Sequence, residues 1–283
     1  MKDYIAVDWG STQLRGWLIR NGQCVETKQL NVRSPADVFA VHLAPWRGAQ
    51  VLPVLMAGMI GSDAGWQAVP YLDCPTAIDA PGRQLCAVAE GVWIIPGLKI
   101  EQDGDFNVMR GEETQLLGAW QLMPAECYVM PGTHCKWVQV VGGGVRHFAT
   151  AMTGELHHLL MTQSLIGKGL PAQQPDDAAF ERGLEKGLAQ PSLISELFVA
   201  RAARVLGGLA ASSVSDYLSG LLIGAEVATL GQRFCTSAVT LVGEPALNAR
   251  YGRAMKARGM MVNSCSGDEA LLAGMARIMH EQD

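Results

Sequence analysis

Charged residues are scarce in this chain, and no long run of one sign occurs. Asp, Glu, Lys and Arg make up 17% of the 283 residues, and the formal net charge is -5. A protein whose main partner is nucleic acid usually presents clustered Lys and Arg, so this composition argues against such a partner. The hydrophobic share of 49% excludes a disordered chain.

A long apolar segment is also missing. Charged residues near the N-terminus leave no room for the apolar core of a secretory signal. The longest apolar stretch, residues 218–230, is interrupted by two glycines and Glu226 and is too short to span a bilayer. We therefore expect no membrane partner.

Several short motifs are absent as well. The seven cysteines form no C-x-x-C pair, and no histidine stands at the spacing of a zinc site. This odd, scattered set indicates a reducing compartment, the cytoplasm. Neither G-x-x-x-x-G-K-[ST] nor a G-x-G-x-x-G before a helix is found, which argues against Walker-type and Rossmann nucleotide sites.

The patterns that are present predict alternating strands and helices, which is typical of an α/β layer fold. At this length two domains are favoured over a single core. An Asn21-Gly22 turn between apolar alternations predicts an antiparallel meander of three strands. The expected strands lie at 4–7, 14–20, 24–30, 51–58 and 238–243, and the expected helices follow Pro35 or cover 192–209, 215–230 and the segments from Pro245 and Asp268. The polar, proline-containing stretch 167–183 predicts a surface loop.

The strand pattern of the N-terminus begins again near residue 126. A strand, a turn at Gly132-Thr133, a second strand, a hairpin at 142–144 and a third strand follow in order. Laid over the N-terminus, Gly10-Ser11 matches Gly132-Thr133. This correspondence predicts an internal duplication with a period of about half the chain.

The two matching hairpins are candidate phosphate-binding sites. A glycine lets a phosphate oxygen approach the backbone N–H groups, and a following hydroxyl donates a further hydrogen bond. We expect Gly10, Ser11 and Thr12 to contact a phosphate chain, with Asp8 holding Mg²⁺, which takes one or two carboxylates besides phosphates. The alternative is an ordinary hairpin whose Asp satisfies the turn amides.

A second candidate is the start of the helix expected after Gly111. Glu112 and Glu113 fall in its first turn, where the helix dipole favours carboxylates, so a purely structural role is also open. Because this helix leads into the second hairpin, one of the two carboxylates could accept the proton of an attacking hydroxyl.

The remaining candidates concern the acceptor and the nucleoside. Arg15 and Arg110 could bind a carboxylate in bidentate fashion, although each could equally be an ordinary surface Arg. His134 and Lys136 flank the second turn, and Gly243, Glu244 and Asn248 stand where a strand ends and a helix begins, a place suited to a nucleoside. Without the hairpins that junction is a common structural feature. His157 and His158 lack an acid at metalloprotease spacing and are interpreted as structural.

Taken together, these segments resemble a known family. "DWGST", the second Gly-Thr hairpin and "LVGEPAL" are similar to the two phosphate motifs and the adenosine motif of the actin, hexokinase and heat-shock-chaperone ATPase superfamily. More specifically, "AGMIGSDAGW", "MRGEETQLLGA", "MPGTHCKWV", "YLSGLLIGAE" and "LVGEPALNARY" resemble the 2-dehydro-3-deoxygalactonokinase family, over nearly the whole chain.

The resemblance implies two RNase H-like domains, residues 1–123 and 124–283, with a nucleotide cleft between them. It implies ATP and Mg²⁺ as cofactors and transfer of the γ-phosphate to the terminal hydroxyl of 2-dehydro-3-deoxy-D-galactonate, which gives the 6-phosphate in galactonate catabolism. The implied site residues are Asp8 on the magnesium side, the first loop Gly10, Ser11 and Thr12, the second loop Gly132, Thr133 and His134, and Gly224, Gly243, Glu244 and Asn248 around the nucleoside.

The chain departs from the superfamily in one respect. Its sugar kinases commonly place an Asp before the second hairpin, whereas this sequence offers Glu112 and Glu113. We favour Glu112 as the base, because Glu113 could pair with Arg110. Gly61 and Ser62 are expected to bind the acceptor because their loop follows a strand.

Three other functions remain open. The chain could phosphorylate another sugar acid or pantothenate, or it could be an actin-like or chaperone-like ATPase switch, although its length leaves little room for the insertions of such switches. A silent sugar sensor is a third alternative. A homodimer is expected only from general frequencies of oligomeric states.

Overall fold

The protein is described by a computed structural model that covers residues 3–10, 13–31, 34–102, 104–189, 192–234 and 237–282. The chain forms two compact units, and each is described by itself. The first contains Met1–Pro124, Val140–Phe148 and Ser266–Asp283, and the second contains Ala125–Gln139 and Ala149–Cys265. The chain first passes from one unit to the other after residue 124, one residue from the boundary expected after residue 123. Residues 140–148 and 266–283 were expected in the second domain but belong to the first unit.

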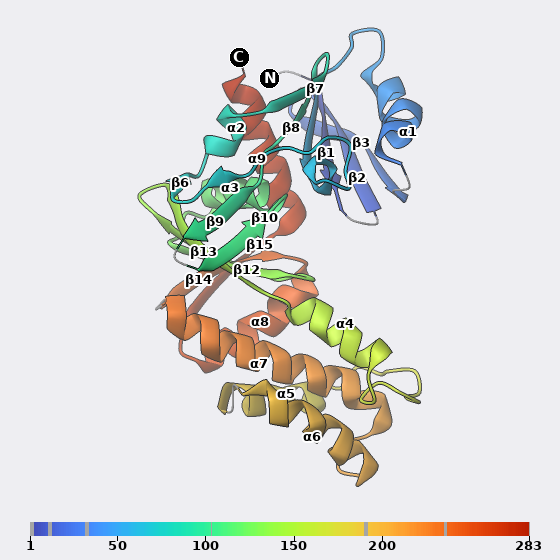
Figure 1. Ribbon diagram of the computed structural model, residues 1–283, viewed down its shortest axis with the longest axis vertical. Helices are drawn as coiled ribbons and strands as arrows, with labels where there is room; N and C mark the ends of the chain where they lie inside the picture. Colours follow the sequence, from blue (N-terminus) through green and yellow to red (C-terminus); the bar gives the residue numbers. More distant parts are fainter. Residues whose placement is uncertain are drawn as a thin grey trace. The chain divides into compact units, whose positions relative to one another are not determined.

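The first unit is built on a six-stranded mixed sheet with the order β3-β2-β1-β4-β8-β7 (Figure 1). Strands β1 to β3 form the predicted antiparallel meander, and β4 joins β1 in parallel. Asn21 and Gly22 turn the chain between β2 and β3 with φ values of 51° and 76°, as this turn requires. The strands are β1 (Tyr4–Trp9), β2 (Gln13–Arg20), β3 (Gln23–Asn31), β4 (Val54–Gly58), β7 (Cys86–Ala89) and β8 (Val92–Ile94).

Both faces of this sheet are covered, which explains why β1 and β4 are apolar at nearly every position. Ile5, Val7 and Met56 pack on one face with residues of the short helices that follow Pro35. Tyr4 and Ile19 on the opposite face meet α9 residues at a small cavity. The covering helices are α1 (Pro35–Val38), the π-helix η1 (Phe39–Leu43), the 3₁₀ helix η2 (Ala44–Arg47) and α9 (Gly267–Glu281).

Helix α3 (Glu112–Leu122) packs on α9 through glycines. A Cβ added at Gly118 would lie 1.7 Å from the carbonyl oxygen of Ala270, and one at Gly274 would lie 2.1 Å from that of Thr114. The two backbones therefore touch at this crossing, and the C-terminal helix supports the helix that carries Glu112 and Glu113.

Between β4 and α3 the chain forms short elements that periodicity alone did not predict. A three-stranded sheet has the order β10-β9-β5, and β6 pairs with Gly144 and Val145 of β13. These elements are η3 (Met59–Gly61), β5 (Leu72–Asp73), β6 (Thr76–Ala77), α2 (Ala80–Arg83), β9 (Leu98–Gln102) and β10 (Asp105–Met109).

The second unit repeats the strand arrangement of the first, which confirms the predicted duplication of the strand pattern. Its sheet runs β15-β14-β11-β12-β13, with β11 antiparallel to β12 and parallel to β14. Strands β12 and β13 leave this unit at residue 140 and return to it at residue 149. The strands are β11 (Cys127–Met130), β12 (Cys135–Val141), β13 (Gly144–Ala151), β14 (Ala238–Gly243) and β15 (Met261–Ser266).

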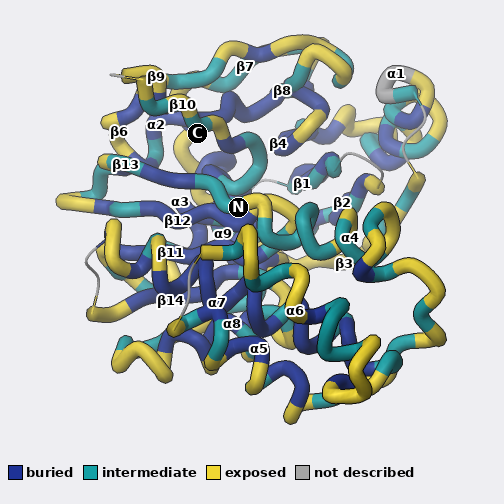
Figure 2. Tube along the Cα trace, turned by 60° about the horizontal axis from the view of Figure 1, so that its bottom comes forward, coloured by how far each residue is buried: buried dark blue, intermediate teal, exposed yellow. Residues whose placement is uncertain are grey.

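Helices cover this second sheet, and one of them corrects an expectation. The predicted loop 167–183 is wrong in its second half, because helix α5 begins at Asp177 and buries Ala179, Phe180 and Gly183. Exposed and buried positions alternate along this helix (Figure 2). The helices of this unit are α4 (Thr153–Gln163), α5 (Asp177–Ala189), α6 (Leu193–Val205), η4 (Ala211–Ser213), α7 (Val214–Phe234) and α8 (Pro245–Ala257).

Helices α5 and α7 cross as closely as α3 and α9 do. A Cβ at Gly183 would lie 2.0 Å from the carbonyl oxygen of Tyr217, and one at Gly224 would lie 2.7 Å from that of Leu184. Position 224 therefore requires glycine, because any side chain there would collide with the backbone of α5. Within the described ranges, no helix is both long enough and apolar enough to cross a membrane.

Candidate active site

In the first unit, Asp8 lies where β1 ends and its carboxylate is held by Arg15. The two residues are direct cross-strand neighbours, so their side chains share one face of the sheet. Nη2 of Arg15 lies 2.6 Å from Oδ2 of Asp8, and Nη1 donates a hydrogen bond to Asp268 in the first turn of α9. The contacts of Arg15 are thus with two carboxylates. The hairpin tip beyond Gly10, with Ser11 and Thr12, lies outside the described residues.

Two glycines bring the start of α3 to this same edge of the sheet. Gly58, at the end of β4, has φ 91°, and a Cβ there would lie 2.5 Å from the carbonyl oxygen of Trp9. Gly111, with φ 106°, precedes α3, and its Cβ would lie 3.2 Å from Cα of Gly58. Side chains at either position would prevent this approach. The predicted acids therefore begin a helix next to the carboxyl ends of β1 and β4.

Glu112 and Glu113 have different environments. Glu112 is partly exposed, and its Oε2 accepts a hydrogen bond from the Arg110 backbone N–H at 3.0 Å. Glu113 is 2% exposed, and its carboxylate accepts from the Gly111 N–H at 2.7 Å and from the Thr114 hydroxyl at 3.0 Å. Burial, and then the charge of Glu112, raise the pKa of Glu113 to about 8.

This raised pKa predicts a pH-dependent stability. The unfolded carboxyl titrates near 4.5, so the folded state binds the extra proton below its own pKa and loses that stabilisation as the pH rises towards 8. We expect the unfolding free energy of the wild type to fall between pH 5 and pH 8 relative to that of Glu113→Gln. Urea denaturation of both proteins at pH 5, 6.5 and 8 measures this, and parallel pH profiles would contradict it.

The loop after β4 brings Gly61 and Arg110 together. The Arg110 guanidinium lies 4.0 Å above the ring of Tyr71, and its Nη2 donates to the carbonyl of Val69 at 2.6 Å. A Cβ at Gly61 would lie 2.8 Å from Nη1 of Arg110. In the part of the chain that the structure describes, Nε and Nη1 are buried without a hydrogen-bond partner. Ser62 donates its hydroxyl to the carbonyl of Met59 at 2.7 Å.

In the second unit, the turn at Gly132, Thr133 and His134 is held by the first turn of α4. The Glu155 N–H donates to the carbonyl of Thr133 at 3.0 Å, and a Cβ at Gly154 would lie 2.4 Å from that of Gly132. Nε2 of His134 lies 2.5 Å from Oε2 of Glu155. Thr133 and His134 are exposed, as a phosphate contact requires.

Lys136 does not share this exposed position. It lies within β12, opposite Met130 in the register, and is 4% exposed. The sequence placed it beside the turn, but the strand begins at Cys135 and carries the lysine into the sheet. The structure therefore separates Lys136 from the exposed tip of the hairpin.

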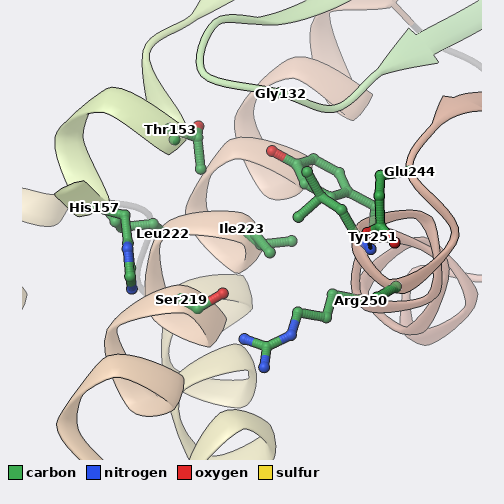
Figure 3. A pocket seen from close by; sticks show the side chains of 12 residues that line it. Gly132, Thr153, His157, Ser219, Leu222, Ile223, Glu244, Arg250 and Tyr251 are labelled. Carbon is green, nitrogen blue, oxygen red and sulfur yellow. Dashed lines mark hydrogen bonds between the residues drawn. The ribbon is translucent and has the colours of Figure 1, made fainter. Parts of the chain in front are cut away.

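The same unit contains a cavity of about 320 Å³ beside Gly132. Glu244 lies at its edge as the N-cap of α8, accepting the Leu247 N–H at 3.0 Å. Asn248 points inward instead, and its Nδ2 donates to the carbonyls of Gly243 and Cys265 at 3.3 and 3.2 Å. The lining residues, shown in Figure 3, are Gly132, Thr153, Gly154, His157, Ser219, Leu222, Ile223, Glu244, Ala246, Leu247, Arg250 and Tyr251.

Several of these lining residues were not predicted from the sequence. His157, interpreted as structural, lines the cavity, and burial lowers its pKa. Arg250 is held by Asp216, with 2.5 Å between Nη2 and Oδ1, and lies 5.0 Å from the ring of Phe180. Arg250 and Tyr251 follow Leu247 by three and four residues, so helical spacing could have predicted that they share its face of α8. No feature of the sequence around His157 predicts that it lines a cavity.

Two units with the same order of their first five strands, each opening on a glycine-containing hairpin, define the class of actin-like ATPase folds. A solved structure with this fold is the activator of 2-hydroxyisocaproyl-CoA dehydratase from Clostridium difficile with bound ADPNP. It has a TM-score of 0.53 and 12% identity, over 99% of this chain and 97% of that chain.

Closer similarity identifies the family within this class. The model of the 2-keto-3-deoxy-galactonokinase family matches residues 8–278. A 2-dehydro-3-deoxygalactonokinase from Escherichia coli (strain K12) is 50% identical over 98% of this chain and 97% of its own. The solved structure of a putative 2-dehydro-3-deoxygalactonokinase from Sinorhizobium meliloti has a TM-score of 0.90 and 31% identity over 99% of both chains. The chain belongs to the 2-keto-3-deoxy-galactonokinase family, and it is a kinase.

Proposed function

We propose that this kinase uses ATP to phosphorylate the terminal hydroxyl of 2-dehydro-3-deoxy-D-galactonate, giving the 6-phosphate in galactonate catabolism. The family match supports the acceptor. The observation that carries the proposal is the approach of Gly111 to Gly58, which sets the start of α3 next to the end of β4, the strand that pairs with the strand of Asp8. In this proposal Glu112 is the base and Asp8 the metal-side carboxylate, both in the first unit.

We assign nucleotide binding in the second unit to the cavity and the hairpin next to it. Its volume of about 320 Å³ lies within the range of small-molecule sites. Thr133 and His134 are exposed for phosphate contacts, and Glu244 and Arg250 are at the wall for the nucleoside. Gly10, Ser11 and Thr12 of the first hairpin complete the phosphate contacts in this proposal, while Gly243 and Asn248 shape the end of β14.

The residues at the end of β1 fit a magnesium ion brought in with ATP. Asp8 offers carboxylate oxygens at a partly exposed position, and Mg²⁺ needs few protein ligands when phosphates supply the rest. Within the described ranges, no group of three or more His, Cys, Asp and Glu side chains forms a metal site by itself, which agrees with such shared coordination. When bound, the ion would neutralise charge on the phosphates.

The chain's own residues then divide the chemistry. Glu112, partly exposed at the start of α3, accepts the proton of the acceptor hydroxyl as that oxygen attacks phosphorus, and the bond to the leaving phosphate oxygen breaks. Glu113 is unsuited to this because its raised pKa keeps it protonated near neutral pH. It holds the turn at Gly111 instead. Glu112 thus remains the preferred base, but the reason is the burial of Glu113 and not a pairing of Glu113 with Arg110.

The acceptor carboxylate is assigned to Arg110. Its Nε and Nη1 are buried without a hydrogen-bond partner among the described residues, so each can donate a hydrogen bond to a carboxylate. We expect Gly61→Ala, which sets a methyl group against Nη1, and Arg110→Lys, which removes the guanidinium donors, to raise the KM for the sugar acid by about 10-fold or more.

Steady-state kinetics with the acceptor varied, and ADP titrated calorimetrically, measure this. The dissociation constant for ADP should be unchanged in both variants, because Gly61 and Arg110 are assigned to the acceptor and not to the nucleotide. Ser62→Ala serves as the control in the same loop, since its hydroxyl is already paired with Met59. An unchanged KM in Arg110→Lys would contradict the assignment.

The experiment that tests the function is ADP release by purified protein with MgATP. We expect strong stimulation by 2-dehydro-3-deoxy-D-galactonate and little by its gluconate epimer or pantothenate. Stimulation by another acid would favour a different small kinase, and equal ADP release without any acceptor would favour an ATPase switch. Product analysis by ³¹P NMR tests phosphorylation at the terminal hydroxyl.

A cytoplasmic location and a homodimer also belong to this proposal. Among the described residues no cysteine forms a disulfide bond, which suits a reducing compartment. The dimer rests only on general frequencies and is tested by light scattering.

A further inference from the structure

Glu226 is a carboxylate buried inside the second unit. It lies on α7 and is 7% exposed. Its Oε1 accepts a hydrogen bond from Nε1 of Trp137 at 2.7 Å, and its Oε2 accepts from the hydroxyl of Tyr251 at 2.6 Å and from the hydroxyl of Thr153. Three donors from three separate elements therefore meet on one side chain.

Each donor belongs to an element that carries part of the nucleotide site. Thr153, the first residue of α4, and Tyr251 on α8 both line the cavity. Trp137 lies in β12, three residues after His134 of the second hairpin, and is fully buried. Glu226 and Trp137 are outside the described lining of the cavity, so neither is positioned to touch a ligand there.

A carboxylate at this buried position lowers the stability of the fold relative to an apolar side chain. Burying its charge costs desolvation energy, and well-packed apolar side chains often give the more stable protein. A buried polar network whose members are satisfied does provide something else, which is a single arrangement of the elements that it joins. Here α4, α8 and β12 cannot shift independently without breaking a bond to Glu226.

We propose that Glu226 is a positioning residue for the adenine nucleotide, joining the walls of the cavity to the second phosphate hairpin. A nucleoside in the cavity and phosphates at the hairpin are covalently joined in one ligand, so their sites must stay within the span of that ligand. This inference rests on the proposed function, because it takes the cavity to be the nucleotide site.

The test is calorimetric titration of the full-length protein with ADP. Glu226→Gln keeps the size of the side chain but offers one acceptor oxygen to three donors, and Trp137→Phe removes one donor without altering the cavity wall. We expect each variant to bind ADP about 10-fold more weakly, roughly the effect of one lost hydrogen bond to a charged group. Trp137→Phe should add little in the Glu226→Gln background, because both changes break the same connection.

A matched pair of tyrosines separates positioning from stability. Tyr251→Phe removes a buried hydroxyl that donates to Glu226, whereas Tyr128→Phe removes one that accepts from the Ala125 N–H at 2.8 Å in the same unit. Both should lower the melting temperature, but only Tyr251→Phe should weaken ADP binding.

The failures are distinguishable. If the wild type itself does not bind ADP, the proposed nucleotide site is wrong and the inference falls with it. If the wild type binds ADP and folded Trp137→Phe and Glu226→Gln bind it equally well, the nucleotide site stands and the positioning role is overturned. Should Glu226→Gln not fold, Trp137→Phe and the tyrosine pair decide the question.

Discussion

Replacing Glu112 with Gln should lower kcat by about 10²- to 10⁴-fold, the usual contribution of a general base. The amide carbonyl can still accept the Arg110 N–H that Glu112 accepts at 3.0 Å, so the start of α3 should keep its geometry. What is lost is the ability to take a proton from the attacking hydroxyl. The dissociation constant for ADP should be unchanged, because Glu112 is assigned to the acceptor hydroxyl and not to the nucleotide.

Glu113→Gln is the matched control for this substitution. It lies one residue further along the same helix, but its carboxyl is buried and paired with Gly111 and Thr114. We expect it to alter stability and its pH dependence while keeping kcat within about 10-fold of the wild type, below the range of general-base catalysis. Rapid-quench measurement of the first turnover separates the chemical step from product release. Full turnover in both variants would show that neither glutamate is the base.

The second large effect is expected from Gly118→Ala. The new methyl group would lie 1.7 Å from the Ala270 carbonyl oxygen, a contact that only separation of α3 from α9 can relieve. Overpacking costs about 1–3 kcal/mol and occasionally more, and a clash with backbone belongs at the upper end because no flexible side chain can move aside. We expect a loss of about 3 kcal/mol in the free energy of unfolding, together with lower activity, since α3 carries Glu112.

Gly252→Ala tests whether this effect comes from the crossing or from the residue type. Gly252 is also within a helix, but its added Cβ would lie 3.8 Å from the Leu241 side chain and 3.9 Å from that of Val262, which is ordinary contact. Alanine favours a helix over glycine by up to about 1 kcal/mol, so this variant should be neutral or stabilised. Urea denaturation of both variants measures the difference, and equal destabilisation would contradict the close-crossing explanation.

Much of the fold was predictable because its signals are local. Alternation of apolar residues and the Asn21-Gly22 turn predicted the meander, since a turn with two positive φ values between neighbouring strands needs no distant information. The repeat of this pattern near residue 126 predicted the second sheet. Glu112 and Glu113 were likewise identifiable at a helix start, as was the exposed turn at Gly132.

One prediction failed, and some environments were not predictable, because they depend on distant partners. The stretch 167–183 looks like a loop by composition, yet α5 forms there because glycines let its backbone pack against α7. The same crossing explains Gly224, and the strand pairing of β12 explains why Lys136 is buried. None of these contacts joins residues that are neighbours in the sequence.

The sequence by itself determined the meander, its repeat near residue 126, the family motifs and the identity of the chemically useful side chains. Only the tertiary structure decided their environments. Glu112 and Glu113 are adjacent in the chain, but packing buries one of them and raises its pKa. His157, Ser219 and Arg250 line the cavity from three different helices. The hydrogen-bond donors to Glu226 come from residues 25 to 89 positions away in the sequence. Secondary structure follows from short-range sterics and periodicity, whereas burial, charge environment and cavity shape depend on which distant segments pack together.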